Sequence, residues 1–269
     1  MKIAAIQMTS GDDIAANIAA LDTLIATAAK AGAKLVATPE NTFYMRREGM
    51  AAMDDVAMDA HPGIAYAKGA AKQHGIWLLI GSIRALEAGM DKPFNRSVLI
   101  SPEGDIAAAY DKIHLFDVTT PDGKQYRESS QAVGGAAAVT AELGEVTLGL
   151  SICYDLRFPQ LYQQLSGAGA ELLAVPSAFT RPTGQAHWHT LLKARAIENA
   201  CYVIAPAQCG THPGGRETYG HSLIIDPWGE IIAEASADTP EVIVADIAAA
   251  RVDEVRAQIP VLQHRKEIK

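Results

Sequence analysis

The chain has few cysteines and a shortage of basic residues, and both features exclude classes of protein. Its 269 residues include 3 cysteines, Cys153, Cys201 and Cys209, with no paired C-x-x-C spacing. Such a set builds neither a disulfide framework nor a cysteine-rich metal site, and it suits a reducing cytoplasm. Lysine and arginine total 23 against 31 acidic residues, so the net charge is −8. That charge disfavours nucleic-acid or anionic-membrane partners, although a locally cationic pocket can still bind a small anion.

Long apolar segments and low-complexity linkers are also missing. No run approaches the ~18 apolar residues of a membrane-spanning helix. The first residues, KIAAIQM, have a strand pattern rather than the basic and apolar regions of a signal peptide. No Pro- or Ser-rich stretch divides the chain, and 49% of its residues are hydrophobic. We therefore expect one large core and a single domain over residues 1–269.

Short apolar runs alternate with helical patterns along the chain, which is typical of a layered α/β domain. The predicted strands are 2–8, 34–40, 76–83, 96–101, 105–112, 145–153, 171–176, 202–208, 222–226, 230–235 and 241–246, and the predicted helices are 12–31, 61–74, 157–168, 185–200 and 248–258. Turn signals of one type, SPEG at 101–104 and DPWG at 226–229, join strand pairs in the two halves. Their similarity hints at an internal duplication.

The segment GLSICYDLRFP is the most informative, because its apolar run ends at Cys153. The preceding residues are apolar and β-branched, as in a strand buried on both faces, and the apolar spacing from 157 to about 166 is helical. Cys153 therefore lies at a strand-to-helix junction, where backbone N–H groups and the helix dipole favour a thiolate. Inert buried cysteines are also common, so this segment alone leaves both interpretations open.

Two further predicted strands end at charged residues. KLVATPE ends at Glu40, and IAAAYDKIH carries Lys112 near its end. A thiol nucleophile needs a base to take its proton and a cation to hold the oxyanion that forms when it attacks a carbonyl. Each charge alone is most simply a solvated surface residue. Together with Cys153, Glu40 and Lys112 supply all three roles.

These residues and their contexts resemble the nitrilase, or carbon-nitrogen hydrolase, superfamily. Its Glu-Lys-Cys triad is matched by Glu40 in TPEN, Lys112 in YDKIHLFD and Cys153 in SICYDLRFP. The likeness runs from KIAAIQM through PSAFT, HWHTLLKARAIENACYV and AQCG to YGHSLIIDPWGEIIAEA, nearly the whole chain. It implies a four-layer αββα sandwich, with two sheets face to face, helices outside, and the triad at the sheet ends. It also implies a second glutamate beside the site, at Glu128 in YRESS.

The resemblance implies covalent hydrolysis of a linear amide. Glu40 would remove the thiol proton, Cys153 would attack the amide carbon, and Lys112 with a neighbouring backbone N–H would stabilise the oxyanion. The expected products are an acid and ammonia, by way of a thioester acyl-enzyme. Glu128 would orient Lys112 or assist a proton transfer, although a glutamate in a polar loop is by default a surface residue.

Within the superfamily, the later segments resemble the branch that includes deaminated glutathione amidase. These segments are PSAFTRPTGQAHWHTLLKARAIE, CYVIAPAQCG and ETYGHSLIIDPWG. The alternatives are an ω-amidase acting on α-ketoglutaramate and an N-carbamoyl amino acid amidohydrolase. A more distant alternative is a non-catalytic binding protein on the same fold. A thiol redox enzyme would need a resolving cysteine near Cys153, and the neighbouring residues include none.

Arg157 is the first candidate for binding a substrate carboxylate. It follows the nucleophile by four residues, one helical turn, so it could face the same cavity, or it could pair with Asp155 and fix the turn. The resemblance adds Tyr154, Phe179 and Thr183 as substrate contacts. Two other arginines in neighbouring loops, Arg181 and Arg216, are further candidate cations.

No metal or cofactor is expected. His187 and His189, at i and i+2 of a predicted helix, point to different faces, and no nearby Cys/His/Asp cluster completes a site. The glycine pair at 134–135 and the PGGR loop at 213–216 lack the context of a nucleotide-binding loop. The expected partner is a small-molecule amide. The resemblance also implies a homodimer or higher oligomer, which would cover Tyr162 and Leu165 on the helix after the nucleophile.

Overall fold

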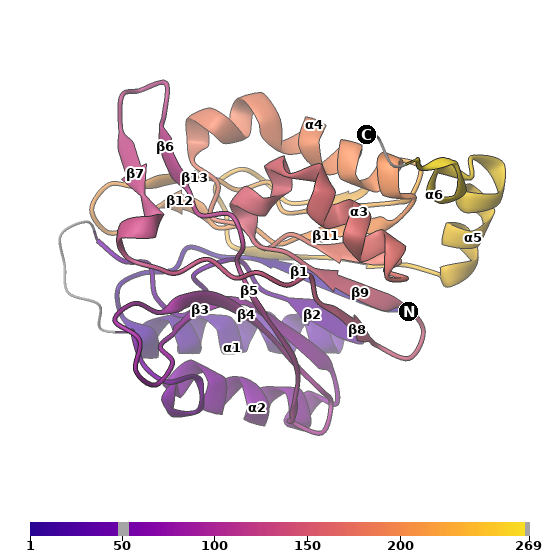
Figure 1. The fold of residues 1–269 in the computed structure, drawn as a ribbon. Coiled ribbons are helices and arrows are strands. Elements are labelled where there is room, and N and C mark those ends of the chain that lie inside the picture. Colours follow the sequence, from indigo (N-terminus) through magenta and orange to yellow (C-terminus); the bar gives the residue numbers. More distant parts are fainter. Residues whose placement is uncertain (48–53, 267–269) are drawn as a thin grey trace.

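The computed structural model describes residues 1–47 and 54–266. Two six-stranded sheets lie in the middle of the molecule, with two helices on each outer face and two short helices at one end (Figure 1). The helices are α1 (Ile14–Lys30), α2 (Pro62–His74), α3 (Pro159–Gly167), α4 (Arg181–Asn199), α5 (Ala249–Gln258) and α6 (Val261–His264). Helices α1 and α2 cover one sheet, and α3 and α4 cover the other. The predicted αββα sandwich is confirmed.

The two sheets have the same topology. The first has the order β16-β1-β2-β3-β4-β5 and the second β15-β14-β11-β10-β9-β8. Their strands are β1 (Lys2–Gln7), β2 (Leu35–Ala37), β3 (Trp77–Ala85), β4 (Phe94–Ile100), β5 (Ile106–Asp111), β8 (Thr140–Glu142), β9 (Thr147–Leu150), β10 (Leu172–Ala174), β11 (Tyr202–Ala205), β14 (Leu223–Ile225), β15 (Ile231–Glu234) and β16 (Glu241–Asp246).

In each half, three parallel strands are connected through two helices and followed by an antiparallel hairpin. Strands β1, β2 and β3 are parallel and lead to β4 and β5, while β9, β10 and β11 are parallel and lead to β14 and β15. The predicted turn at 101–104 joins β4 to β5, and the one at 226–229 joins β14 to β15. The internal repeat at which the turns hinted is therefore present in the topology.

Both faces of the central strands are buried, which explains their continuous apolar sequences. Along β1, Ile3 and Ala5 pack into the core between the sheets, while Ala4 and Ile6 pack beneath α1 and α2. The alternation follows from the two-residue period of a strand. Each sheet is thereby held between two apolar layers, and the strand ends are fixed relative to one another.

Two predictions made from local patterns differ from the structure. Tyr162 and Leu165 are fully buried in the chain's own core, so they give no support to an oligomer, which stays a prediction. Five short strands were not predicted: β6 (Asp117–Thr119), β7 (Gln125–Arg127), β8, β12 (Cys209–Thr211) and β13 (Glu217–Tyr219). These short strands are partly exposed and lack the apolar run that marked the equally short but fully buried β2, β10 and β14. Among the described residues, no helix combines the length and apolar character needed to cross a bilayer.

Gly81 in β3 lies against the segment that leads from β2 to Glu40. Its N–H donates to Thr38 Oγ1 at 2.9 Å, and a Cβ at this position would come within 2.3 Å of the Pro39 carbonyl oxygen. That contact is with backbone, which cannot move aside as the end of a side chain can. The absence of a side chain at Gly81 therefore lets the strand end approach closely enough to place Glu40.

We expect Gly81→Ala to lower the free energy of unfolding by about 1–3 kcal/mol, the usual cost of overpacking. It should also reduce kcat for the amide hydrolysis that the resemblance implies, because the backbone before Glu40 must shift. Gly69→Ala in α2 is the matched control, since a Cβ there meets nothing within 4 Å. Urea unfolding and kcat of both variants test this, and equal behaviour of the two would contradict it.

Candidate active site

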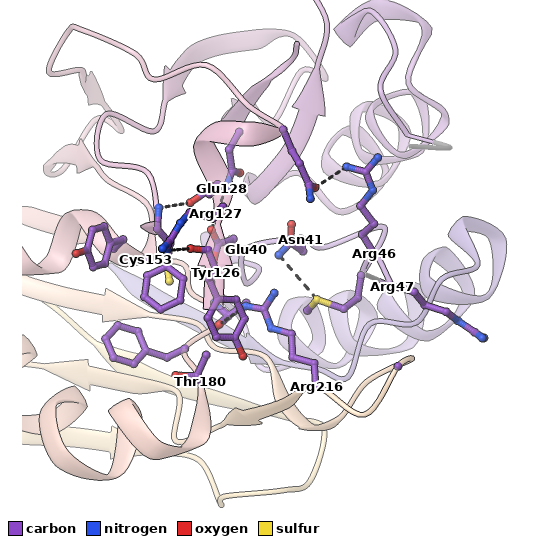
Figure 2. Close-up of a pocket in the computed structure, with 18 of the residues that line it drawn as sticks. Glu40, Asn41, Arg46, Arg47, Tyr126, Arg127, Glu128, Cys153, Thr180 and Arg216 are labelled. Atoms are coloured by element: carbon purple, nitrogen blue, oxygen red, sulfur yellow. Dashed lines mark hydrogen bonds between the residues drawn. The ribbon is translucent and has the colours of Figure 1, made fainter. Parts of the chain in front are cut away.

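Three strand ends bring Glu40, Lys112 and Cys153 together, and Figure 2 shows Glu40 and Cys153 side by side in the cavity. Glu40 follows β2, Lys112 follows β5, and Cys153 follows β9 as the first residue of a short 3₁₀ helix (Cys153–Arg157). Lys112 Nζ lies 2.8 Å from Glu40 Oε1, and the charges of both residues act on the thiol of Cys153. All three side chains are buried. The two sheets thus bring an acid, an ammonium and a thiol together.

Glu128 completes the group as a second carboxylate. Its Oε2 accepts from Lys112 Nζ at 2.9 Å and from the backbone N–H of Phe116 at 2.7 Å. Lys112 therefore lies between two carboxylates, with Glu40 on one side and Glu128 on the other. The predicted position of Glu128 next to the lysine agrees with this geometry.

Asn95 links the two carboxylates and was not predicted. Its Nδ2 donates to Glu40 Oε1 at 3.0 Å and to Glu128 Oε1 at 2.9 Å. The backbone N–H of Ala178 donates to the other oxygen of Glu40 at 2.9 Å. Asn95 begins a run of three polar residues, NRS, in strand FNRSVLI, so no local pattern distinguishes it from its neighbours.

Cys153 adopts a backbone conformation that is uncommon for a residue with a side chain. Its φ is +48°, and its N–H donates to the Pro176 carbonyl at 2.9 Å. Positive φ costs a non-glycine residue roughly 1–2 kcal/mol, and such conformations concentrate at functional sites. The sharp turn directs the thiol away from the strand axis and toward Glu40.

Asp155 fixes this turn to the end of β5. The fully buried carboxylate accepts from Tyr110 Oη at 2.7 Å and from the backbone N–H groups of Ile152 and His114, both at 3.0 Å. The His114 ring also lies 2.7 Å from it. Sequence reasoning missed this role and considered a pair with Arg157 instead. That pairing is wrong, since the Asp155 oxygens contact the groups named here.

The electrostatics of the cluster favour a protonated thiol in the resting site. Burial and the charge of Glu40 raise the pKa of the Cys153 thiol, and Lys112 offsets only part of this effect. Burial opposes the charge of Glu40, but the attraction of Lys112 outweighs it and lowers the pKa of the carboxyl group. Burial likewise opposes the charge of Lys112, while Glu128 and Glu40 raise its pKa well above 10.5. The resting group is a thiol, two carboxylates and an ammonium.

The cluster lies at the base of a cavity of about 460 Å³. Strand β7 with the turn before it, the loop between β12 and β13, and the segment after β2 line its rim. The described residues that line it are Glu40, Asn41, Tyr44, Met45, Arg46, Arg47, Arg84, Asn95, Lys112, Phe116, Lys124, Gln125, Tyr126, Arg127, Glu128, Ser130, Gln131, Cys153, Tyr154, Ala178, Phe179, Thr180, Thr183, Pro213, Gly214, Gly215 and Arg216. Tyr154, Phe179 and Thr183, predicted as contacts, are among them.

Arg157 is not among the residues that line this cavity, contrary to the prediction. Its guanidinium nitrogens lie 3.3 Å from His187 Nδ1, and its Cζ lies over the rings of Tyr154 and Phe179, at 5.8 and 5.3 Å from their centroids. Those aromatic rings separate it from the cavity. The four-residue spacing from Cys153 to Arg157 does not show on which side of the two rings the guanidinium lies.

Arg216 takes the position that was predicted for Arg157. It extends from the loop between β12 and β13 toward Glu40, beside Tyr126 (Figure 2). Its Nη2 donates to the Ala178 carbonyl at 2.9 Å, whereas its buried Nε has no hydrogen-bond partner among the described residues. Arg181, the other candidate, instead pairs with Asp238. A cationic group with unused hydrogen-bonding capacity therefore faces the cavity.

Residues 2–257 match the family model of the carbon-nitrogen hydrolases. The chain belongs to this family. It is 43% identical over 265 residues to deaminated glutathione amidase from Synechocystis sp., with 97% of each chain covered. This carbon-nitrogen hydrolase is therefore an amidase, as the resemblance implied.

Solved structures agree with this assignment. Nit3 from Saccharomyces cerevisiae, a member of branch 10 of the nitrilase superfamily, superposes on this carbon-nitrogen hydrolase with a TM-score of 0.89 and 28% identity, covering 99% of this chain and 97% of Nit3. A Glu-to-Gln variant of the amidase from Nesterenkonia sp. AN1 superposes with a TM-score of 0.80 and 27% identity, covering 97% of this chain and 98% of that one. In that structure, acrylamide has added to the active-site cysteine.

We expect Lys112→Ala and Glu40→Gln each to lower kcat at least ~10²-fold, the usual loss for an oxyanion donor or a general base. Lys112→Ala should also lower the free energy of unfolding by about 3–5 kcal/mol, because two buried carboxylates lose their counter-charge. Lys112→Arg should not restore activity, since a broad planar group cannot replace a compact ammonium. Steady-state kinetics and urea unfolding check both effects, and near-normal turnover in either variant would refute the arrangement.

A raised thiol pKa predicts how Cys153 reacts with iodoacetamide. Deprotonation is displaced to higher pH, so the alkylation rate should still be rising at pH 9, the ordinary pKa of a thiol. Mass spectrometry should find that loss of activity follows modification of Cys153 and not of Cys201 or Cys209, which are fully buried. A rate that levels off below pH 8 would show a preformed thiolate and contradict the expectation.

Proposed function

We propose that this amidase hydrolyses a linear amide that carries carboxylates, with deaminated glutathione as the preferred substrate. The observation that carries the proposal is the thiol of Cys153 beside Glu40 and Lys112 at the base of a cavity lined with cations. Acyl transfer needs a nucleophile, a base and an oxyanion-binding group in contact, and these three residues match those needs.

In the proposed acylation step, Cys153 Sγ attacks the amide carbon while Glu40 takes the thiol proton. Because the thiol pKa is raised and the carboxyl pKa is lowered, proton transfer ahead of attack is unfavourable, so the two events are coupled. Lys112 Nζ and a backbone N–H beside the nucleophile donate to the developing oxyanion. The proton then passes from Glu40 to the leaving nitrogen, the C–N bond breaks, and a thioester remains.

In the proposed deacylation step, a water molecule enters the place of the leaving amine. Glu40 takes a proton from this water, and the resulting hydroxide attacks the thioester carbon. Collapse of the tetrahedral intermediate breaks the C–S bond, and Glu40 returns its proton to the sulfur. Glu128 and Asn95 keep Lys112 and Glu40 in place during both steps.

Cations around the cavity support an anionic substrate. Arg216 faces the cavity with a buried Nε that has no partner in the described part of the chain. Arg127 also lines it, and its Nη1 donates to the backbone carbonyls of Val118 and Tyr126. A guanidinium binds a carboxylate through paired N–H donors, so both residues suit a substrate with negative charge.

Deaminated glutathione has a carboxylate on each side of its scissile amide, whereas α-ketoglutaramate has one and is smaller. A cavity of about 460 Å³ with more than one cationic side chain favours the larger dianion. Hydrolysis of deaminated glutathione releases cysteinylglycine as the amine. Ammonia, the product expected from the sequence, forms only when the substrate is a primary amide. The Synechocystis relative bears the name of this activity, which supports the choice.

We expect Arg216→Leu to lower kcat/KM for deaminated glutathione by ~10–100-fold, the loss typical of a hydrogen bond to a charged group. The reason is that the substrate carboxylate loses its guanidinium partner. The same variant should change hydrolysis of an uncharged aliphatic amide far less. Release of a primary amine, or of ammonia from α-ketoglutaramate and the neutral amide, gives the rates.

Arg157→Leu is the control, because its guanidinium lies behind the rings of Tyr154 and Phe179. It should leave the order of substrates unchanged. Faster hydrolysis of the uncharged amide than of deaminated glutathione by the unmodified enzyme would refute the anionic substrate while leaving the amide chemistry intact. Faster hydrolysis of α-ketoglutaramate would assign the ω-amidase alternative.

A further inference from the structure

A second group of chemically reactive side chains lies outside the cavity, on the sheet covered by α4. His189 comes from α4, His221 lies just before β14, and Glu234 is the last residue of β15. One ligand atom from each lies within 4.8 Å of the other two. None of the three lines the cavity. Their convergence from segments far apart in the sequence is therefore not part of the amidase site.

The two histidine rings converge on one carboxylate oxygen. His189 Nε2 lies 3.0 Å from Glu234 Oε1, and His221 Nδ1 lies 2.9 Å from the same atom. Ligand atoms around a tetrahedral Zn²⁺ are about 3.3 Å apart, given bonds of about 2.0–2.1 Å. A small outward rotation of the side chains would therefore admit an ion.

Packing holds the histidines close to this geometry. The carbonyl of His221 accepts from Trp188 Nε1 at 2.8 Å, which ties it to the residue before His189. The His221 backbone has φ of +52°, and its ring packs on Tyr219 with centroids 4.5 Å apart. The ring of His189 meets Tyr219 edge-on at 5.9 Å. Ligands fixed by neighbouring side chains lose less freedom when a metal binds.

All three side chains of the group reach solvent. The side chains of His189, His221 and Glu234 are 31, 24 and 38% exposed, so an ion can enter and water can complete its coordination.

We propose that His189, His221 and Glu234 form a binding site for a divalent transition-metal ion of the zinc class. Two imidazoles and one carboxylate are ligands that Zn²⁺ takes, and a water molecule fills the fourth position. The ion joins α4 to the hairpin of β14 and β15. Since α4 begins next to cavity residues Thr180 and Thr183, the ion stabilises the wall of the amidase cavity without taking part in its chemistry.

The sequence argument against a metal site compared His187 only with His189. These two side chains do point in different directions, and His187 contacts Arg157. His189 meets partners that lie more than thirty residues away in the sequence. The spacing of neighbouring residues cannot reveal such a group. The expectation of no metal considered only ligands close together in the sequence.

The test is a titration of the full-length, chelator-treated protein with Zn²⁺ alone, in the Cys153→Ala background. That background removes a thiol in the cavity that would itself bind zinc. Calorimetry should show one Zn²⁺ per chain, and the melting temperature should rise on binding. His189→Gln and Glu234→Gln should each weaken binding by at least ~10-fold, and both should abolish the rise in melting temperature.

His187→Gln is the matched control, on the same helix two residues earlier, and it should bind Zn²⁺ unchanged. Circular dichroism and the melting temperature without metal show whether each variant is folded. The absence of saturable binding in the parent protein would overturn the proposal. Undiminished binding by both folded variants, His189→Gln and Glu234→Gln, would overturn it too.

Discussion

The contact of one buried ammonium with two carboxylates underlies the rest of the site. Lys112 is 2% exposed, and a charge so removed from water is tolerated only with close counter-charges. Glu40 and Glu128 provide them, and their own charges depend in turn on Asn95 and on backbone N–H groups. Burying any one of these charged groups alone would therefore cost free energy, whereas together they stabilise one another. The chemical properties of Cys153 follow from this set.

The duplicated topology explains how such a group can be assembled without a flexible loop. The end of β2 in the first half delivers Glu40, and the end of β9 in the second half delivers Cys153. The sheets face each other, and the core between them fixes their separation. Asp155 then connects the turn at Cys153 to the end of β5, which Lys112 follows. Rigid strands from both halves thus fix the short distances between the side chains of Glu40, Lys112 and Cys153.

The layered α/β class could be predicted from the long alternation of strand and helix patterns, and the resemblance to a known family supplied the four-layer sandwich. The strand patterns placed Glu40, Lys112 and Cys153 each after a strand, and the structure brings these three side chains together. The positions of Arg157 and Arg216 could not be predicted in this way, because the choice between them depends on the aromatic rings of Tyr154 and Phe179. The group of His189, His221 and Glu234 was likewise hidden, because it depends on the packing of α4 against a hairpin.

The rim of the cavity is built from parts that the two main sheets do not include. Strands β6 and β7 form one two-stranded ladder, and β12 and β13 form another, which a bridge between Thr218 and Thr180 joins to the start of α4. Glu128 directly follows β7, so the ladder of β6 and β7 also helps to place the carboxylate that contacts Lys112. The rim and the buried charged group are therefore coupled through one residue. Any exchange of this rim would have to keep Glu128 in position for the ammonium of Lys112 to retain both of its counter-charges.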